Sequence, residues 1–391
     1  MPIALPYLGT VLSEISTHAL ELLQQYSGAA DLSALNIQLR KDGEAVGDIT
    51  WILQQLELRA KAKAKLGEQA SQLFFTRNGL EQATRWPVAR YHAQRLAQLG
   101  SVTDLGCGLG IDSLAFCEAG LQVVAIEQDA ETAQLAAWNL KTHNAEVQTA
   151  AAQESEIRTT GVWLDPARRN LAGRFDARRM LGPQDFSPPL DFAFSLLSKF
   201  PGGIKLAPGL PHELIPPRFE ATWVSHNREL VELSLWNMDP ARAGKRFAVM
   251  VSENQVDEFS DEVFPAQLAE LGKFISEPDS ALIRSGLIGA FAQEHSLAAI
   301  AKDIAYLSSN QLPSSPWLRS FEVIENLPID KKLLRRRLGE MGIGRLEIKK
   351  RGIDIDPAQF RKELKLKGEG AATLILTRVG DARRALVCNE C

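Results

Sequence analysis

A glycine-rich turn between a strand and a helix constrains the fold of this chain most strongly. The motif is Asp104-Leu-Gly-Cys-Gly-Leu-Gly110, and its first residues belong to a short predicted strand, residues 102–105. Residues 111–118 have the apolar pattern of a helix, and a second apolar run ends at Glu127. This order predicts a βαβ unit. Glycines at such a turn let the backbone approach a ligand, and an acid at the tip of the second strand can accept hydrogen bonds from ribose hydroxyls.

The spacing of the glycines separates two kinds of cofactor. In the dinucleotide fingerprint G-x-G-x-x-G the third glycine would stand where this chain has Ile111. Asp104 suits a cation better than a phosphate, and S-adenosylmethionine carries a sulfonium and an amino group. The segment resembles motif I and the following acidic position of class I S-adenosylmethionine-dependent methyltransferases. The resemblance implies a set of cofactor-binding residues: Asp104, Gly106, Gly108, Gly110 and Glu127.

Strand and helix patterns continue beyond this unit. Alternation up to about residue 251 predicts an α/β fold with a doubly wound, mostly parallel seven-stranded sheet and helices on both faces. Runs 221–225 and 230–236 are close enough to form an antiparallel hairpin. Gln153 follows the third predicted strand, where such folds often contact adenine, so we expect Gln153 to complete the cofactor set.

The length of 391 residues is too great for one ordinary core. Residues 1–95 have helical periodicity and predict an N-terminal helical region, followed by the α/β domain of residues 96–255. The polar segment 253–262 suggests a linker, and residues 256–316 form a small further segment. Residues 317–391 combine strand and helix patterns and predict a small C-terminal α/β module.

The motif Asp165-Pro-Ala-Arg-Arg169 ends the fourth predicted strand, at the edge where a doubly wound sheet presents its substrate. Methyl transfer requires an aligned nucleophile and the exclusion of water. Asp165 is the candidate hydrogen-bond acceptor or general base. Pro166 is the candidate rigid turn, and Arg168 and Arg169 could clamp a phosphate or pair with local acids. The tetrad is similar to the Asp-Pro-Pro-Arg of RNA uracil-5 methyltransferases, but no cysteine stands between Asp165 and Val387 to act as their nucleophile.

Three further polar residues are candidates for lining the same pocket. Lys205 lies near the end of the fifth predicted strand, although a lysine there can equally extend its charge to solvent. Gln82 and Thr84 precede the first strand, in a region that often covers the cofactor in this class of enzyme.

Composition and segment patterns indicate the cellular setting. No apolar run approaches the length of a membrane span, and the N-terminus lacks a basic region followed by an apolar core. We therefore expect a cytoplasmic protein without a membrane segment. Cys388 and Cys391 form a C-x-x-C, but no second Cys or His pair lies nearby, so we expect a frayed, inert tail and no metal site.

Charge is distributed unevenly along the chain. The net charge is −4, yet residues 331–384 contain 16 Lys and Arg against 7 Asp and Glu, a local charge of +9 that leaves the rest near −13. The candidate phosphate contacts in this region are Lys349, Lys350, Arg351, Lys362, Lys365 and Lys367. A basic end of this kind suits an anionic partner, while a solvated surface is the alternative.

Longer segments extend the resemblance to about residues 80–388. A bacterial family of class I methyltransferases with a C-terminal THUMP-like domain is similar to this chain at 164–169, 204–209, 223–225, 229–233 and 346–352. Segments 276–280 and 306–309 are similar to the small ferredoxin-like segment that precedes that domain. The resemblance implies S-adenosylmethionine as cofactor, a THUMP-like domain at residues 317–391, and RNA as partner, because THUMP domains bind RNA.

We therefore expect an S-adenosylmethionine-dependent methyltransferase that acts on structured RNA through its basic C-terminal module. A methyltransferase of a protein or a small molecule is one alternative. A catalytically silent cofactor-binding protein is another, suggested by the degenerate Asp-Pro-Ala-Arg motif. The acceptor atom and the oligomeric state stay open.

Overall fold

The chain folds into two compact units. The computed structural model describes residues 16–168 and 186–391, except for the side chains of residues 167 and 168. The first unit consists of Met1–Leu206, Leu210–Pro216 and Ser234–Ala241, and the second of Ala207–Gly209, Pro217–Leu233 and Arg242–Cys391. The division into four domains expected from the sequence stays a prediction.

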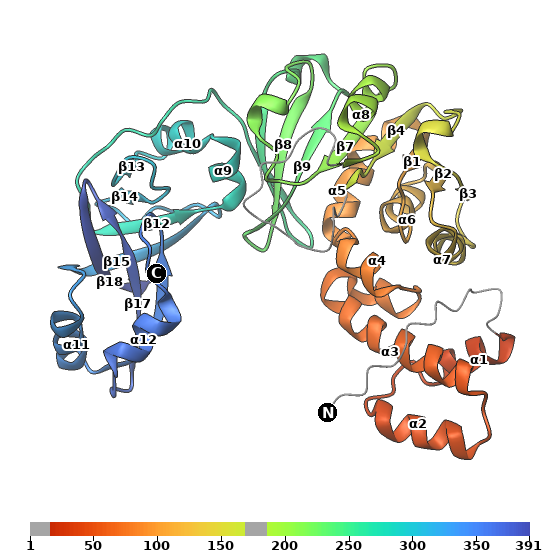
Figure 1. The fold of residues 1–391 in the computed structure, drawn as a ribbon. Helices are drawn as coiled ribbons and strands as arrows, with labels where there is room; N and C mark the ends of the chain where they lie inside the picture. Colours follow the sequence, from red (N-terminus) through yellow and green to blue (C-terminus); the bar gives the residue numbers. More distant parts are fainter. Residues whose placement is uncertain (1–15, 169–185) are drawn as a thin grey trace. The chain divides into compact units, whose positions relative to one another are not determined.

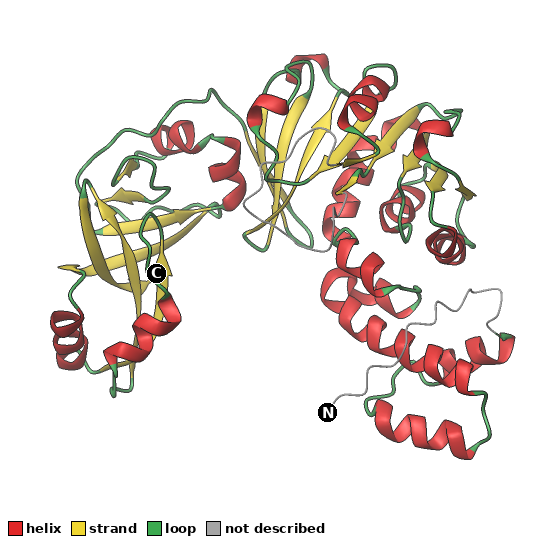
Figure 2. Cartoon of the chain, in the orientation of Figure 1, coloured by secondary structure: helices red, strands yellow, loops and turns green. Residues whose placement is uncertain are grey.

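The N-terminal part of the first unit is helical, as Figures 1 and 2 show. Its α-helices are α1 (Thr17–Gln25), α2 (Leu32–Lys41), α3 (Val46–Leu66), α4 (Arg77–Gln82) and α5 (Trp86–Leu96). Both α1 and α2 pack against α3. Asp31 caps α2 by accepting hydrogen bonds from the backbone N–H groups of Ser33 and Ala34. The predicted helical region is confirmed.

A nine-stranded sheet has the order β11-β10-β8-β9-β7-β4-β1-β2-β3. Its strands in the first part of the chain are β1 (Ser101–Leu105), β2 (Gln122–Glu127), β3 (Ala145–Thr149), β4 (Gly161–Leu164) and β7 (Gly202–Leu206). Neighbouring strands among these five pair in parallel. The order moves outward from β1 in both directions, which confirms the doubly wound fold and places a topological switch point between β1 and β4.

Helices α6 (Ile111–Glu118), α7 (Ala130–Leu140) and α8 (Leu190–Leu197) connect or flank these strands. In Figure 1, α6 and α7 lie beside β1–β3, against which they pack. The short strands β5 (Ala167–Arg168) and β6 (Phe186–Ser187) pair antiparallel at the two ends of the connection predicted to carry function. The interior of that connection lies outside the described residues.

The remaining strands of the large sheet are β8 (Glu220–His226), β9 (Glu229–Trp236), β10 (Arg246–Val251) and β11 (Val256–Phe259). The turn between β8 and β9 has positive φ at Asn227 (51°) and Arg228 (66°), as a type I′ hairpin turn requires. Strand β10 pairs parallel with β8 and antiparallel with β11, so β10 and β11 extend the seven expected strands to nine. The segment predicted as a linker therefore contains β11, because an edge strand needs no apolar pattern.

A second, seven-stranded sheet has the order β13-β14-β12-β15-β18-β17-β16. Its strands are β12 (Phe274–Pro278), β13 (Ala298–Ala299), β14 (Leu307–Ser309), β15 (Leu318–Pro328), β16 (Ile343–Lys350), β17 (Gly370–Val379) and β18 (Ala382–Glu390). Residues 256–316 thus contribute strands to the same sheet as the C-terminal module. Helices of this part are α9 (Ser280–Ser285), α10 (Ile288–Glu294), α11 (Lys331–Glu340) and α12 (Pro357–Leu364).

Two apolar clusters lie on this smaller sheet. One joins α11 and α12 to β16–β18 through residues such as Leu338, Phe360 and Leu374, and the two helices lie side by side in Figure 1. The other contains Tyr306, Phe321 and other residues. Cys388 belongs to this second cluster and is fully buried in β18, so the expectation of a frayed tail at Cys388 was wrong. Burial raises the pKa of the Cys388 thiol to about 12, which keeps it protonated.

None of the helices in the described ranges combines the length and the apolar character needed to cross a bilayer. Within the same ranges, no group of three or more His, Cys, Asp or Glu side chains could hold a metal ion.

Candidate active site

A cavity of about 1140 Å³ opens in the first unit beside the carboxyl ends of β1, β2 and β4. Ligands of doubly wound sheets bind at this edge, next to the switch point. Most of the residues singled out in the sequence line it: Gln82, Thr84, Gly106, Gly108, Glu127, Gln153, Asp165, Pro166 and Lys205. The fold therefore brings together side chains that are more than 100 positions apart in the chain.

The glycine-rich turn forms one wall of the cavity. Gly106 has φ +87° and Gly108 φ +55°, which are left-handed conformations that glycine adopts without strain. The N–H groups of Gly106 and Cys107 both donate to the carbonyl oxygen of Ile126. A Cβ atom at Gly106 would lie 3.2 Å from the carbonyl oxygen of Asp165, so the absence of a side chain lets the turn pass close to the end of β4.

Glu127 ends β2 with its carboxylate at the cavity. Its Oε2 accepts a hydrogen bond from the N–H of Gly108 at 3.1 Å, and its Oε1 accepts one from the N–H of Asp129 at 2.9 Å. Each carboxylate oxygen can accept a further bond. The backbone thus fixes a carboxylate that can still bind two hydroxyl groups.

Asp104 and Gly110 do not line the cavity. The Asp104 side chain lies inside the fold, 1% exposed, where its Oδ2 accepts a hydrogen bond from Ser113 Oγ at 2.6 Å. Burial, followed by the charge of Asp112, raises the pKa of Asp104 to about 8. The expectation that Asp104 meets a bound cation is thus corrected, because its side chain faces α6. Gly110, with φ +78°, packs against Leu140 of α7, whose Cδ1 would lie 3.1 Å from an added Cβ.

Asp112 supplies a carboxylate to the cavity instead. Its Oδ2 accepts a hydrogen bond from Thr84 Oγ1 at 2.6 Å, and its Oδ1 lies 2.8 Å from Nδ1 of the fully buried His92. Burial acts to raise the pKa of Asp112, but the charge of His92 and its hydrogen bond outweigh burial, and the pKa lies below its usual range. No local sequence pattern identifies Asp112 or His92, because their contacts join α5, α6 and the segment before α5.

Asp165 and Lys205 form an ion pair at the cavity wall. Asp165 Oδ2 lies 2.5 Å from Lys205 Nζ, and the two side chains are 32% and 14% exposed. Lys205 Nζ also donates to Thr84 Oγ1 at 2.9 Å. Pro166, the residue after Asp165, is buried. Gln153 is exposed, follows β3 and also lines the cavity. The side chain of Arg168 and all of Arg169 lie outside the described residues.

Comparisons with known proteins agree on one family. Two proteins from Mycobacterium tuberculosis strains CDC 1551 / Oshkosh and ATCC 25618 / H37Rv, both named uncharacterized S-adenosylmethionine-dependent methyltransferases, are each 33% identical to this chain over 346 residues. The matches cover 84% of this chain and 93% of each relative. The chain belongs to this family of S-adenosylmethionine-dependent methyltransferases.

Two further comparisons concern the fold of the methyltransferase. A family profile described as "THUMP domain-like" matches residues 318–390. The crystal structure of a "putative methyltransferase" from Porphyromonas gingivalis W83 superimposes with a TM-score of 0.77 at 20% identity, and the match covers 95% of this chain and 96% of that one. The predicted α/β methyltransferase fold and the C-terminal THUMP-like domain are confirmed.

The chemistry of the cavity fits the cofactor of the methyltransferase. Its lining carries more carboxylates than cations, which suits a sulfonium and an amino group better than a pyrophosphate. The acidic lining residues are Glu81, Asp112, Glu127, Asp129, Glu131 and Asp165, against the cations Arg77 and Lys205. We therefore expect Glu127 to bind the ribose, the Gly106–Gly108 turn to border the cofactor, and Asp112 to face its cationic end.

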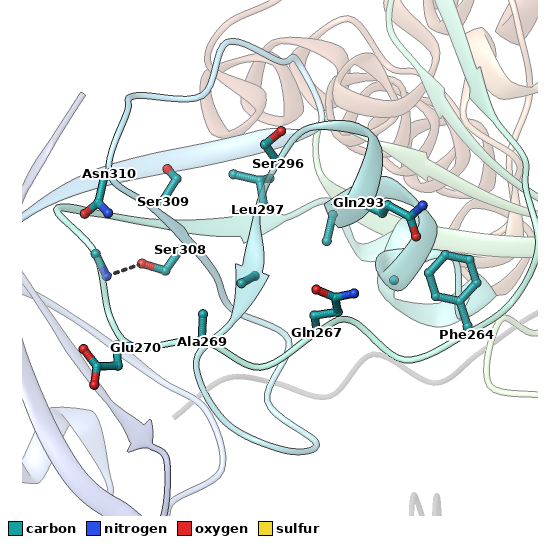
Figure 3. A pocket seen from close by; sticks show the side chains of 14 residues that line it. Phe264, Gln267, Ala269, Glu270, Gln293, Ser296, Leu297, Ser308, Ser309 and Asn310 are labelled. Carbon is teal, nitrogen blue, oxygen red and sulfur yellow. Dashed lines mark hydrogen bonds between the residues drawn. The ribbon is translucent and has the colours of Figure 1, made fainter.

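A smaller cavity of about 410 Å³ lies in the second unit of the methyltransferase (Figure 3). Exposed polar side chains line it, among them Gln267, Gln293 and Asn310. The N–H of Gly272 donates to Ser308 Oγ at 2.9 Å at its edge, the dashed line in Figure 3. No predicted cofactor or catalytic residue lines this cavity, whereas most of them line the larger one, which is therefore the candidate active site.

The basic run of the C-terminal module is partly used by the fold itself. Lys349 Nζ lies 2.8 Å from Glu277 Oε2, and Arg351 lies 3.5 Å from Glu277 Oε1 and donates to the carbonyl oxygen of Ala305. Lys349 and Arg351 therefore join β16 and its following turn to β12 and the segment before β14. They are poorly placed for the phosphate contacts expected from the sequence, whereas Lys350 is exposed.

Proposed function

We propose that this methyltransferase methylates RNA and that residues 317–391 bind the RNA. One observation carries the proposal: the THUMP-like segment presents exposed cations that form no ion pair with any described residue. Among them are Lys332, Arg345, Lys350, Lys362, Lys365 and Lys367. Lysine and arginine side chains that are free of acidic partners can contact phosphates without breaking an internal bond.

The cavity supports a particular acceptor chemistry. S-adenosylmethionine supplies an electrophilic methyl group on a sulfonium. Asp165 offers a carboxylate at the carboxyl end of β4, and a carboxylate accepts hydrogen bonds from an N–H group. We infer that Asp165 orients an acceptor that carries an N–H group and receives the proton that this nitrogen loses.

The experiment is methyl transfer from labelled S-adenosylmethionine to fractions of cells that lack the gene. RNA, protein and small-molecule fractions are incubated separately with the purified full-length protein. We expect label in the RNA fraction, released by ribonuclease. Label in protein or in small molecules would contradict the RNA assignment, and tight cofactor binding without transfer to any fraction would favour a silent binding protein.

A further inference from the structure

We propose that Lys205 is a positioning residue, which aims the Asp165 carboxylate and balances its charge in the cofactor cavity, and that Thr84 and Asp112 hold Lys205 in place. The orienting part of this role rests on the proposed function, in which Asp165 meets the acceptor. The charge-balancing part requires only the cofactor, so it can be tested without knowing the acceptor.

The sheet register brings the pair together. Strand β4 pairs parallel with β7, with Leu164 opposite Ile204. Asp165 and Lys205 are the next residues along each strand, so both side chains leave the same end of two neighbouring strands. The ion pair at 2.5 Å is therefore built into the backbone pairing rather than formed by two long surface side chains.

A second bond fixes the lysine from the other side. Lys205 Nζ donates to Thr84 Oγ1, and that hydroxyl donates to Asp112 Oδ2 at 2.6 Å. Thr84 is 7% exposed and Asp112 is 7% exposed, so solvent screens this chain of bonds weakly. His92 lies behind Asp112 and is fully buried, with its ring centroid 4.4 Å from that of Trp163. Charged groups therefore alternate in sign from Asp112 through Lys205 to Asp165.

The loop that carries Thr84 is held in turn by α3. Lys65 Nζ donates to the carbonyl oxygens of Leu80, Glu81 and Ala83 at 2.9, 2.6 and 3.2 Å. These carbonyls lie at the end of α4 and directly before Thr84. These three hydrogen bonds restrict the backbone before Thr84, and so they restrict where the Thr84 hydroxyl can lie.

Changing one member of the ion pair to a neutral side chain removes one charge from the cavity wall and keeps the charge of the other member. S-adenosylmethionine is a sulfonium cation, whereas S-adenosylhomocysteine has a neutral thioether at the same atom. Loss of the Lys205 charge should strengthen binding of S-adenosylmethionine relative to S-adenosylhomocysteine, and loss of the Asp165 charge should weaken it. A residue that only supports the fold would change both affinities alike.

The experiment is calorimetry of both compounds with full-length Lys205→Met, Asp165→Asn and the double variant. The measured quantity is the ratio of the dissociation constants for S-adenosylhomocysteine and S-adenosylmethionine. We expect this ratio to rise about 5-fold in Lys205→Met and to fall about 5-fold in Asp165→Asn, the effect of one charge several ångströms away in a partly solvated site. The double variant should return close to the wild-type ratio.

Lys199→Met is the matched control, because Lys199 is exposed after α8 and does not line the cavity. If Lys205→Met does not fold, Asp165→Asn and Thr84→Val still test the proposal, since Thr84→Val should shift the ratio by less than Asp165→Asn does and leave the fold intact. Ratios that stay unchanged in the folded variants, or that move in the same direction in Lys205→Met and Asp165→Asn, would overturn it.

Methyl transfer provides the second readout. With the RNA fraction, Lys205→Met should transfer methyl groups at least 10-fold more slowly, with the acid limb of its pH–rate profile at higher pH, and Lys205→Arg should recover part of the rate. A normal rate and profile in Lys205→Met would overturn the orienting role. If wild-type protein does not methylate RNA, the proposed function fails, while the ratio of affinities still decides the charge-balancing role.

Discussion

Two buried carboxyl groups in the first unit have opposite protonation because their neighbours differ. Asp112 lies beside His92 and has a pKa below its usual range, so it is ionised at neutral pH. Asp104 has a hydroxyl partner in Ser113, burial and the charge of Asp112 outweigh the more distant charge of Lys205, and its pKa of about 8 keeps it mostly protonated there. Its Oδ1 has no hydrogen-bond partner among the described residues, which agrees with a neutral group.

Asp104→Asn should therefore stabilise the protein increasingly as the pH rises. Between about pH 4 and pH 8 the folded state keeps the Asp104 proton that the unfolded state has lost, so ionisation destabilises the wild type as pH rises. The free energy of unfolding of the variant minus that of the wild type should increase by up to about 1.4 kcal/mol per pH unit in this window. Urea unfolding at pH 5, 6, 7 and 8 measures it; a constant difference would show that Asp104 is ionised in the fold.

Glu127→Ala should weaken binding of S-adenosylhomocysteine. Loss of two charge-assisted hydrogen bonds to the ribose costs roughly 2–3 kcal/mol, or about 30- to 150-fold in affinity. Calorimetry measures the dissociation constant, and Glu146→Ala, an exposed position on β3 away from the cavity, is the control. A folded Glu127→Ala protein that binds as tightly as the wild type would refute this role for Glu127.

Single residues were predictable where backbone conformation and chemistry coincide in one short segment. Gly106, Gly108 and Glu127 belong to one βαβ unit, so spacing alone placed them together at the cavity. Asp104 was assigned to the same cavity because spacing does not reveal which way a strand residue faces. Asp112 and His92 depend on the packing of α5 against α6, which no local pattern encodes.

At the scale of elements, Lys65 connects α3 to the segment that covers the cavity. Its ammonium group lies at the carboxyl end of α4. There it binds carbonyl groups that α4 leaves unpaired and complements the dipole of that helix. The basic stretch from Arg59 to Lys65 is therefore partly structural. Arg59 likewise donates to the carbonyl oxygen of Leu73, while Lys61 pairs with Glu57 on the same helix.

Lys65→Met should destabilise the first unit and loosen the cover of the cavity. We expect a loss of about 1.5–3 kcal/mol in the free energy of unfolding, because the three carbonyl oxygens lose a charged donor. Lys63 lies two residues earlier in α3 and its side chain is 69% exposed, so Lys63→Met should change the free energy of unfolding by less than about 0.5 kcal/mol. Chemical denaturation of both variants decides this, and equal stability of the two would contradict the tether.

The elements that the sequence missed are those without an apolar pattern of their own. Strand β11 is an edge strand of alternating exposed residues, and α2 begins in a polar segment whose cap, Asp31, is its clearest signal. Strand β18 has arginines at its second and third positions and contains Cys388 of the expected tail, although its residues Ala385–Cys388 are buried and the strand lies between β15 and β17. The central parallel strand β4 was evident, since it has no polar side chain.

At the scale of the whole molecule, opposite charges are concentrated in different units. The carboxylate-lined cavity belongs to the first unit, and the unpaired cations of the THUMP-like domain belong to the second. Nothing in the sequence reveals which lysines the fold uses internally, because Glu277 lies more than 70 positions before Lys349 and Arg351. The structure therefore moves the expected phosphate contacts to Lys350, Lys362, Lys365 and Lys367.

The triple change of Lys362, Lys365 and Lys367 to Ala should weaken RNA binding and its salt dependence. Each phosphate contact that is lost removes about one unit from the slope of log affinity against log salt concentration, so we expect a slope flatter by about two to three units. Filter binding at 50–300 mM salt measures it. The control changes Lys41, Lys199 and Lys245, exposed lysines outside the THUMP-like domain, and an equal effect of both triples would mean that the binding is unspecific.

Methyl transfer to RNA by Asp165→Asn tests the central claim most directly, because the side chain keeps its shape and loses its charge. With labelled S-adenosylmethionine and the RNA fraction, we expect turnover about 10²- to 10⁴-fold below wild type. Affinity for the uncharged S-adenosylhomocysteine should stay within a few-fold of wild type. Equal turnover of variant and wild type, in a folded protein that binds the cofactor normally, would contradict the assignment of Asp165 and of this cavity as the site of methyl transfer.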